Sequence, residues 1–396
     1  MTAFQRTLIG LLFIVLLFTI TLVRTELFAI SATGVWLFKC LVTGQFLLLT
    51  VLIGRLAKQP WWFFAGLFIL LELGVWAFAY RLAEGQHQHR RGRRFVQEVV
   101  DGWDKNLIQY DPELSQYDPA LFYTLKPNLQ NVVYKSGFEI NTPIRTNALG
   151  VRDDAASLTN PTIIILGDSF TMGWGVADSI CYASRLEQQL GRKVLNAGIS
   201  SFGTARESML LKRIQRDSCR VLVVQYCVND QPENEELALQ TFKPSPRERY
   251  DAAVRYNTLT ADYYPFKYLY AVLRARMQRM TIKTAGLPGP TGRQIARTRR
   301  SLSPEESFFY AIRRIRQDYK GPIIITCLNP NGTGPETIQA FQSYLINDPL
   351  PGVYLADVSG VLTPTDYFML DNHINSSGHR KVARQLAEVI RANRLL

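Results

Sequence analysis

The sequence predicts an α/β fold, a three-layer parallel sheet flanked by helices, preceded by an α-helical transmembrane region of three helices. Two observations lead to this prediction. Three long apolar runs lie near the amino terminus, and each is close to the roughly 20 residues that cross a bilayer core. Beyond about residue 95, short β-branched runs alternate with helical patterns, which is typical of a parallel sheet covered by helices.

Composition and charge exclude several classes of protein. The chain has 396 residues, 47% hydrophobic and 20% charged, which excludes an intrinsically disordered chain and a collagen-like one. The net charge of +12 favours anionic surroundings such as lipid headgroups, acidic glycans or nucleic acid, without choosing among them. The five cysteines lie far apart with no histidine cluster beside them, so we expect no metal site and no disulfide framework. We also expect no cofactor.

The apolar runs predict a transmembrane region over residues 1–81, with helices at about 7–23, 27–53 and 61–80. The first run lacks the small-residue cleavage site of a signal peptide and is followed at once by more membrane-length sequence. A soluble helical bundle would instead show polar faces at helical period. We therefore expect a multi-pass protein of the cell membrane, with the lipid bilayer as a partner.

The distribution of basic residues bears on the orientation of these spans. The inside loops would hold Arg6, Arg55 and Lys58 in one orientation, and Arg24, Arg81, Arg90, Arg91, Arg93 and Arg94 in the other. The positive-inside rule thus favours a cytoplasmic carboxyl-terminal part, but large domains translocate largely regardless of charge. Both orientations stay open on this ground.

The part after the membrane region divides into a basic, irregular lead-in over 82–145 and an α/β domain over 146–396. The predicted strands are Thr162–Leu166, Lys193–Leu195, Val221–Tyr226, Pro322–Cys327 and Val353–Ala356. The predicted helices are Ala183–Leu190, Ala205–Arg216 and a last one at about 378–393. An insertion at about 264–300 breaks this rhythm with interleaved basic and aromatic residues.

A candidate nucleophile follows the first predicted strand of this domain, in Gly167-Asp168-Ser169-Phe170. Functional groups of an open α/β sheet collect at the carboxyl ends of its strands. Ser169 would there begin a helix whose free N–H groups face a developing oxyanion. Taken alone, the tetrapeptide is equally typical of an ordinary turn and helix cap.

A serine nucleophile needs a base, and the chain has four histidines. His87 and His89 lie in the arginine-rich tail, where a surface role is expected. His373 follows Asp371 by two residues, so the carboxylate can turn back and orient the imidazole. His379 lies on the first turn of the last helix, where we expect a solvated or capping side chain. These positions favour His373 as the base.

Four blocks of this sequence, in order, resemble those of the SGNH (GDSL-like) hydrolases. The blocks are Gly167-Asp168-Ser169, Asn196-Ala197-Gly198, Asn229-Asp230 and Asp371-Asn372-His373. The segment Thr146–Arg152 is similar to the lead-in of many bacterial members. The resemblance covers about residues 146–396 and does not extend to the apolar runs.

The resemblance implies a role for each block. Ser169 would attack an ester carbonyl, His373 would take its proton, and Asp371 would hold the imidazole. The oxyanion would be bound by the N–H groups of Ser169 and Gly198 and by the side-chain amide of Asn229.

Two departures from the family pattern affect this assignment. Cys227 stands where the third block usually has Gly, and could narrow the pocket or reposition Asn229. The last block is one residue shorter than the usual Asp-x-x-His, a form that occurs in membrane-linked, glycan-modifying relatives. That likeness slightly favours an extracytoplasmic catalytic domain.

The function expected from these features is that of a membrane-anchored esterase or O-acyltransferase, working through an acyl-Ser169 intermediate. Its substrate would be an acyl ester, acetyl esters included, of a glycan or a lipid. The aromatic and basic residues of the insertion would suit a membrane surface or an acidic glycan; an internally packed helix with a solvated basic side is the alternative. No motif indicates nucleic acid binding. A catalytically silent scaffold that keeps the fold to bind glycan is the competing function.

Two charged residues interrupt the apolar runs, Lys39 in the second and Glu72 in the third. At about 1.5 Å per helical residue, they lie roughly 21 and 17 Å from the loop that joins these runs. Charges inside spanning segments usually pair or line a polar cavity, so the two side chains could meet. Alternatively Lys39 reaches an interface and Glu72 is protonated.

Overall fold

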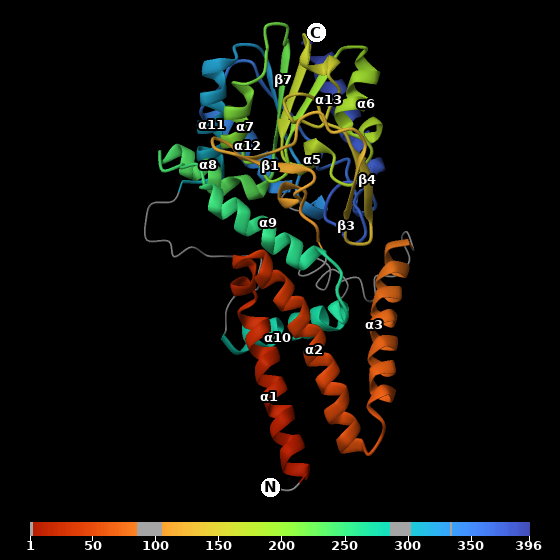
Figure 1. Cartoon of the computed structure of the whole chain (residues 1–396). Coiled ribbons are helices and arrows are strands. Elements are labelled where there is room, and N and C mark those ends of the chain that lie inside the picture. Colours follow the sequence, from red (N-terminus) through yellow and green to blue (C-terminus); the bar gives the residue numbers. More distant parts are fainter. Residues whose placement is uncertain (1–2, 85–104, 286–301, 333–334) are drawn as a thin grey trace. The chain divides into compact units, whose positions relative to one another are not determined.

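A computed structural model describes residues 3–84, 105–285, 302–332 and 335–396 of the chain (Figure 1). It forms two units, the first made of residues 1–107, 136–139 and 248–295 and the second of the remainder. The predicted features at His87, His89 and the Arg90–Arg94 run lie outside the described residues. So does the end of the predicted insertion, after Ala285.

The first unit contains three long apolar helices, α1 (Ala3–Val23), α2 (Ala32–Ala57) and α3 (Trp61–Glu84). All three are long and apolar enough to cross a membrane, as predicted. The second apolar run is not one helix from Leu27, because a 3₁₀ segment occupies Thr25–Ile30. Ser31 then caps α2, its hydroxyl accepting the Gly34 N–H at 3.0 Å, which fixes where the long helix begins.

Lys39 and Glu72 do not pair with each other, so the first of the two alternatives for these residues is wrong. Lys39 Nζ lies 2.7 Å from Asp262 Oδ2. The Glu72 carboxylate accepts the backbone N–H groups of Tyr268 at 3.0 Å and Leu269 at 2.8 Å. Both N–H groups belong to the first turn of helix α10 (Lys267–Ala285), where an α-helix offers no acceptor of its own. Each charge is thus satisfied by a segment about 200 residues further along the chain.

The insertion had two interpretations, an aromatic and basic face for a membrane surface or a glycan, or an internally packed helix. It begins after helix α9 (Arg247–Ala261). Of the aromatic residues from 263 to 270, Tyr263 is exposed, whereas Tyr264, Phe266, Tyr268 and Tyr270 are buried. Phe266 stacks on Phe46 of α2 with ring centroids 5.0 Å apart. These rings therefore pack inside the first unit, and they do not form the exposed face expected for a membrane surface or a glycan.

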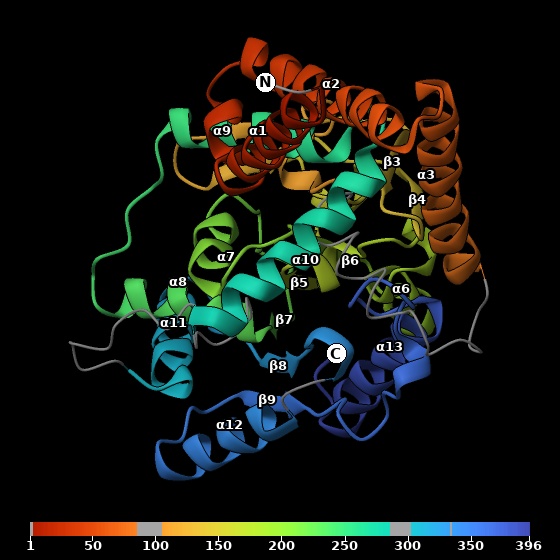
Figure 2. The same cartoon turned by 90° about the horizontal axis from the view of Figure 1, so that it is seen from below.

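The second unit is built around a five-stranded parallel sheet with strand order β6-β5-β7-β8-β9. Its strands are β5 (Ile163–Gly167), β6 (Val194–Gly198), β7 (Val221–Tyr226), β8 (Ile323–Cys327) and β9 (Val353–Ala356). Figure 2 shows the strands in this order across the unit. The side chains of β5 and β7 are fully buried, as expected for a sheet covered on both faces. The predicted α/β fold is confirmed.

Helices cover both faces of this sheet (Figure 1). On one side lie α6 (Tyr182–Leu190) and α13 (Ser376–Ala392), which share a core with Ile163 and Ile165 of β5. On the other lie α7 (Thr204–Leu211), α8 (Gln231–Ala238) and α11 (Pro304–Asp318). Helix α12 (Pro335–Asn347) contacts α11, with Phe308 and Phe341 stacked 4.5 Å apart.

The lead-in to the sheet is more regular than predicted. Strands β1 (Ser115–Asp118) and β2 (Phe122–Leu125) form an antiparallel hairpin within the stretch expected to be irregular. Asp118 makes the turn by accepting the N–H groups of Ala120 and Leu121 at 2.9 and 2.8 Å. The hairpin was missed because β1 is mostly polar and shows no apolar alternation. Strands β3 (Val132–Ser136) and β4 (Ile140–Ile144) form a second pair.

Candidate active site

Ser169 lies at the carboxyl end of strand β5, which pairs with β6 and β7, at the point where the chain turns into the short helix α5 (Ser169–Met172). Asp168 caps this helix, its Oδ1 accepting the Phe170 N–H at 2.9 Å. The cap fixes the turn because it satisfies one of the free N–H groups of the first helical turn. Ser169 is thereby held at the edge of the sheet where functional groups of parallel sheets collect.

The loop before α13 brings His373 to this serine. Ser169 Oγ lies 2.7 Å from His373 Nε2. On the far side of the ring, Nδ1 contacts Asp371 Oδ1, and the same oxygen accepts the His373 backbone N–H at 3.0 Å. An offset of two residues therefore suffices for this Asp to reach the imidazole of its own loop.

This geometry is suited to one kind of chemistry. A hydroxyl hydrogen-bonded to a neutral imidazole can transfer its proton as it attacks a carbonyl carbon. A carboxylate on the other ring nitrogen fixes the tautomer and stabilises the imidazolium that forms. The structure brings the three residues together, and their catalytic roles stay a prediction that is taken up below.

Two aromatic rings enclose the imidazole of His373. Trp174 stacks on it with centroids 5.2 Å apart and planes 20° apart, and Phe170 lies 4.8 Å away at 45°. Both rings are buried. The rings leave the imidazole little freedom to tilt away from Ser169. Neither residue was singled out from the sequence, although Trp174 stands between two glycines in Gly173-Trp174-Gly175.

Gln225 of β7 supports the nucleophile turn from behind. Its Oε1 accepts the Asp168 N–H at 3.1 Å and the Thr171 hydroxyl at 2.9 Å. Sequence reasoning also missed this residue. The available signal was a polar side chain inside the otherwise apolar strand Val221–Tyr226, which a buried strand keeps only where a partner satisfies it.

Three carboxyl groups are buried close to this turn, those of Asp168, Glu207 and Asp230. Burial raises the pKa of Asp168 to about 6 and is opposed mainly by the N–H of Phe170. Burial also raises the pKa of Glu207 and of Asp230, and the neighbouring carboxyl groups raise both further. Each group therefore favours its protonated form more than a solvated carboxyl does.

The structure places Gly198 in register beside Gly167, at the end of β6. A Cβ on Gly198 would lie 2.3 Å from the Met172 nitrogen, so only glycine lets α5 approach the strand this closely. Its N–H donates to Asn196 Oδ1 at 3.1 Å. The predicted oxyanion role of Gly198 therefore requires that this bond be exchanged for one to the substrate.

Asn229 lies on a 3₁₀ turn, Val228–Asp230, directly after β7. It is exposed, and no hydrogen bond within the described part of the chain engages its side chain. Cys227 caps this turn in a box with Asp230. Its φ of −128° is an extended conformation that any residue adopts, so the backbone at this position does not require glycine.

Comparisons with known proteins locate similar structures but no similar sequence. No family model matches the chain, and no curated protein matches it. One similar solved structure is a Desulfitobacterium hafniense protein assigned to the lipolytic G-D-S-L family, with 14% identity and a TM-score of 0.34. The match covers 58% of this chain and 99% of that one.

A second similar structure is a carbohydrate esterase family 2 enzyme, with its carbohydrate-binding domain, from Corynascus thermopiles (Myceliophthora fergusii). Here the identity is 13% and the TM-score 0.33, with 58% of this chain and 65% of that one covered.

His379 differs from its expected solvated state. It is 1% exposed, its Nδ1 accepts the Tyr182 N–H at 3.2 Å, and its ring stacks on that of Tyr182. Burial, followed by the charge of Arg152, lowers the pKa of His379 to about 3. A ring that stays neutral inside the core serves packing, and of the two histidines that the structure describes, His373 is the one that contacts Ser169.

Metal ligands are the remaining kind of site to consider. Across residues 3–84, 105–285, 302–332 and 335–396, no group of three or more His, Cys, Asp or Glu side chains could hold a metal ion. The residues gathered around Ser169 are donors, acceptors and aromatic rings.

Proposed function

We propose that this protein is a membrane-anchored serine esterase or O-acyltransferase of the SGNH type. The observation that carries the proposal is the chain of contacts from Ser169 through His373 to Asp371. The order of the four sequence blocks supports it, because each block falls at the carboxyl end of a strand of the sheet or just before the last helix.

The reaction would proceed in two halves. Ser169 Oγ attacks the ester carbonyl while His373 Nε2 takes the hydroxyl proton, which gives a tetrahedral oxyanion. The C–O bond to the leaving alcohol then breaks, the imidazolium returns the proton to that oxygen, and acyl-Ser169 remains. Water or a sugar hydroxyl next attacks the acyl carbon, with His373 again taking the proton, and Ser169 is released. Hydrolysis and transfer differ only in this second nucleophile.

The oxyanion would be held by the side-chain amide of Asn229 and by the N–H groups of Ser169 and Gly198. Support for Asn229 is its position after β7 with an amide that no described residue engages. Removal of one oxyanion donor typically lowers kcat by about 100 to 1000-fold.

The three apolar helices support anchoring of this site at a bilayer. A substrate held near a membrane fits such a protein, and we propose an O-acylated or O-acetylated glycan, a lipid-linked glycan or a lipid ester. We place the catalytic part on the extracytoplasmic side, where glycans of this kind are displayed.

The full-length protein in detergent, with p-nitrophenyl esters of short and long chains, tests the proposal. An acceptor sugar is added in a parallel series, so that acylated sugar reports transfer and free acid reports hydrolysis. A fluorophosphonate probe should label wild-type protein but not Ser169→Ala. Ser376→Ala is the matched control, since Ser376 is exposed and three residues beyond His373. Labelling that persists in Ser169→Ala, or wild-type protein that is inert to every ester and to the probe, would contradict the proposal and favour a silent glycan-binding scaffold.

A further inference from the structure

The turn Gly173-Trp174-Gly175 has a glycine with a positive φ angle on each side of Trp174. Gly173 and Gly175 have φ angles of +84° and +79°, a conformation that residues with a Cβ rarely adopt. The N–H groups of Gly173 and Trp174 both donate to the Ser169 carbonyl, at 3.1 and 3.0 Å. The turn is thus tied to the residue that bears the proposed nucleophile, and the indole that it presents stacks on His373.

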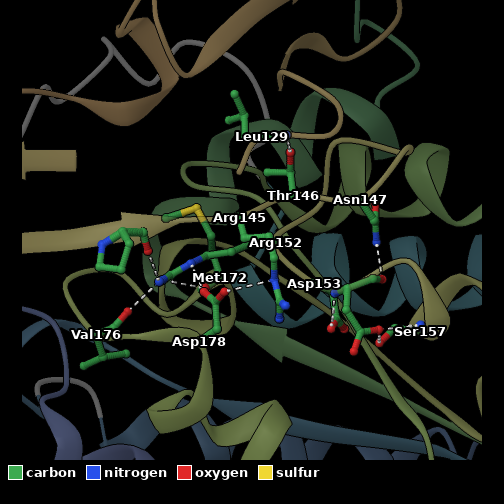
Figure 3. Close-up of polar contacts among 12 residues, drawn as sticks. Leu129, Arg145, Thr146, Asn147, Arg152, Asp153, Ser157, Met172, Val176 and Asp178 are labelled. Carbon is green, nitrogen blue, oxygen red and sulfur yellow. Dashed lines mark hydrogen bonds and ion pairs between the residues drawn. The ribbon is translucent and has the colours of Figure 1, made fainter. Parts of the chain in front are cut away.

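A buried arginine holds this turn from the other side (Figure 3). The side chain of Arg152 is 1% exposed, and its Nε lies 2.7 Å from Asp178 Oδ1. Its two terminal nitrogens donate to four backbone carbonyls, those of Pro143, Met172, Gly173 and Val176. Three of these four carbonyls belong to the segment 172–176 that surrounds Trp174.

We propose that Arg152 is a positioning residue for the reaction, acting through Trp174 on His373. The inference rests on the proposed function, because it gives His373 the role of base. Arg152 fixes the carbonyls on both sides of Trp174, and the turn can then hold the indole in one orientation. The indole holds the plane of the imidazole, and thereby the direction of its Nε2 toward Ser169 Oγ.

Arginine is required here for its geometry and number of donors. A guanidinium has five N–H donors in one plane, and here its two terminal nitrogens donate to four carbonyls while Nε forms an ion pair with Asp178. Lysine keeps the charge but has three donors on a compact ammonium group. Arg152→Lys would therefore leave carbonyls of the turn without a donor while the ion pair with Asp178 could persist.

Arg145 provides a matched control on the same segment. It is 41% exposed, and its Nε lies 3.6 Å from the other oxygen of Asp178. Arg145 shares the Asp178 carboxylate with Arg152, but within the described part of the chain it does not donate to the carbonyls of the turn. If loss of a positive charge near Asp178 were enough to slow the reaction, Arg145→Gln would slow it as well. If the contacts of Arg152 with the turn are what matters, Arg145→Gln should leave the reaction unchanged.

The kinetic test uses full-length wild type, Arg152→Lys, Trp174→Leu, the double variant and Arg145→Gln with a p-nitrophenyl ester. A misplaced base slows the chemical step, so we expect kcat to fall by about 100-fold in each single variant with KM changed less than about 2-fold. Because both residues act through one contact, the double variant should be no more than about 3-fold slower than either single variant. The proposal would be overturned if the fold decrease in kcat of the double variant equalled the product of the two single decreases, or if only KM changed.

A second measurement does not depend on activity. In protein labelled with ¹³C-histidine, the ring-proton signal that disappears in His373→Gln is assigned to that residue. The stacked indole shields this proton, so Trp174→Leu and Arg152→Lys should both move the signal toward the unshielded position, and Arg145→Gln should not. A signal unchanged in Arg152→Lys would overturn the positioning role. Wild-type protein with the shielded signal but no esterase activity would instead overturn the proposed function.

Should Arg152→Lys fail to fold, Asp178→Asn takes its place in both measurements. That variant keeps the guanidinium and removes the carboxylate that aims it. A smaller loss of kcat with the same change in the His373 signal is expected, and an unchanged signal with unchanged kcat would overturn the proposal.

Discussion

His379 makes the stability of the second unit sensitive to pH, and a single substitution isolates the effect. The folded protein holds the imidazole with a pKa of about 3, against 6.5 for a solvated histidine. The unfolded chain therefore binds a proton below about pH 6.5 that the folded chain refuses. Stability contributed by the neutral ring is present above this pH and is lost progressively as the pH falls toward 3.

The magnitude follows from these two values. Between pH 7 and pH 5, proton binding to the unfolded state alone removes about 2 kcal/mol from the free energy of unfolding. The buried carboxyl groups act in the opposite direction, because the raised pKa of Asp168 makes the folded state bind a proton at higher pH than the unfolded state. Their contribution is common to wild type and variant, so a comparison of the two cancels it.

The informative variant is His379→Asn, whose amide oxygen can still accept the Tyr182 N–H but does not titrate. Stability at both pH values is measured by urea unfolding of the full-length protein, with pulse proteolysis reporting the fraction of the second unit that is unfolded. We expect wild type to lose about 2 kcal/mol more than the variant between pH 7 and pH 5. Ile390→Val, a buried change on the same helix, is the control and should cost about 0.5–1.5 kcal/mol at both pH values.

Equal losses in wild type and His379→Asn would refute the reasoning, because the ring would then titrate alike in the folded and unfolded chains. The variant should also keep most of its esterase activity, since His379 does not contact Ser169. A variant that folds normally but has lost turnover would show that the ring takes part in the reaction.

Three further predictions concern the membrane unit, the oxyanion and the topology. Lys39→Leu should lower the thermal stability of the first unit, measured by thermal unfolding in detergent. Adding Asp262→Asn to this variant should restore part of the lost stability. Adding Glu72→Leu instead should lower the stability further. Asn229→Ala should lower kcat by about 100 to 1000-fold at unchanged melting temperature, measured by ester turnover and calorimetry. A cysteine at exposed Arg394 should react in intact cells with a thiol reagent that cannot cross membranes.

Each of these has a contrary result. If Glu72→Leu instead restored the stability lost in Lys39→Leu, the result would support a direct Lys39–Glu72 pair. Full turnover in Asn229→Ala would remove its amide from the oxyanion site. Protection of the cysteine at position 394, with labelling only after lysis, would place the catalytic part in the cytoplasm.

The sequence alone determined the features that depend on local pattern. Uninterrupted apolar runs predict spanning helices because a bilayer imposes a length on them. Short β-branched runs such as Val221–Tyr226 predict buried parallel strands because both faces of such a sheet are covered. The site residues Ser169, Asp371 and His373 could be selected because a nucleophile after a strand and a His near the last helix fit a recurring arrangement.

Only the tertiary structure decided which distant groups meet. The strand order β6-β5-β7-β8-β9, the burial of His379 and the contact of Trp174 with His373 have no local signature. Lys39 and Glu72 show this most directly. Their depths in the membrane helices suggested a mutual pair, but the structure gives them Asp262 and the first turn of α10. A charged group is satisfied by whichever donor or acceptor packing brings within about 3 Å, and packing between segments 200 residues apart is set by the whole fold.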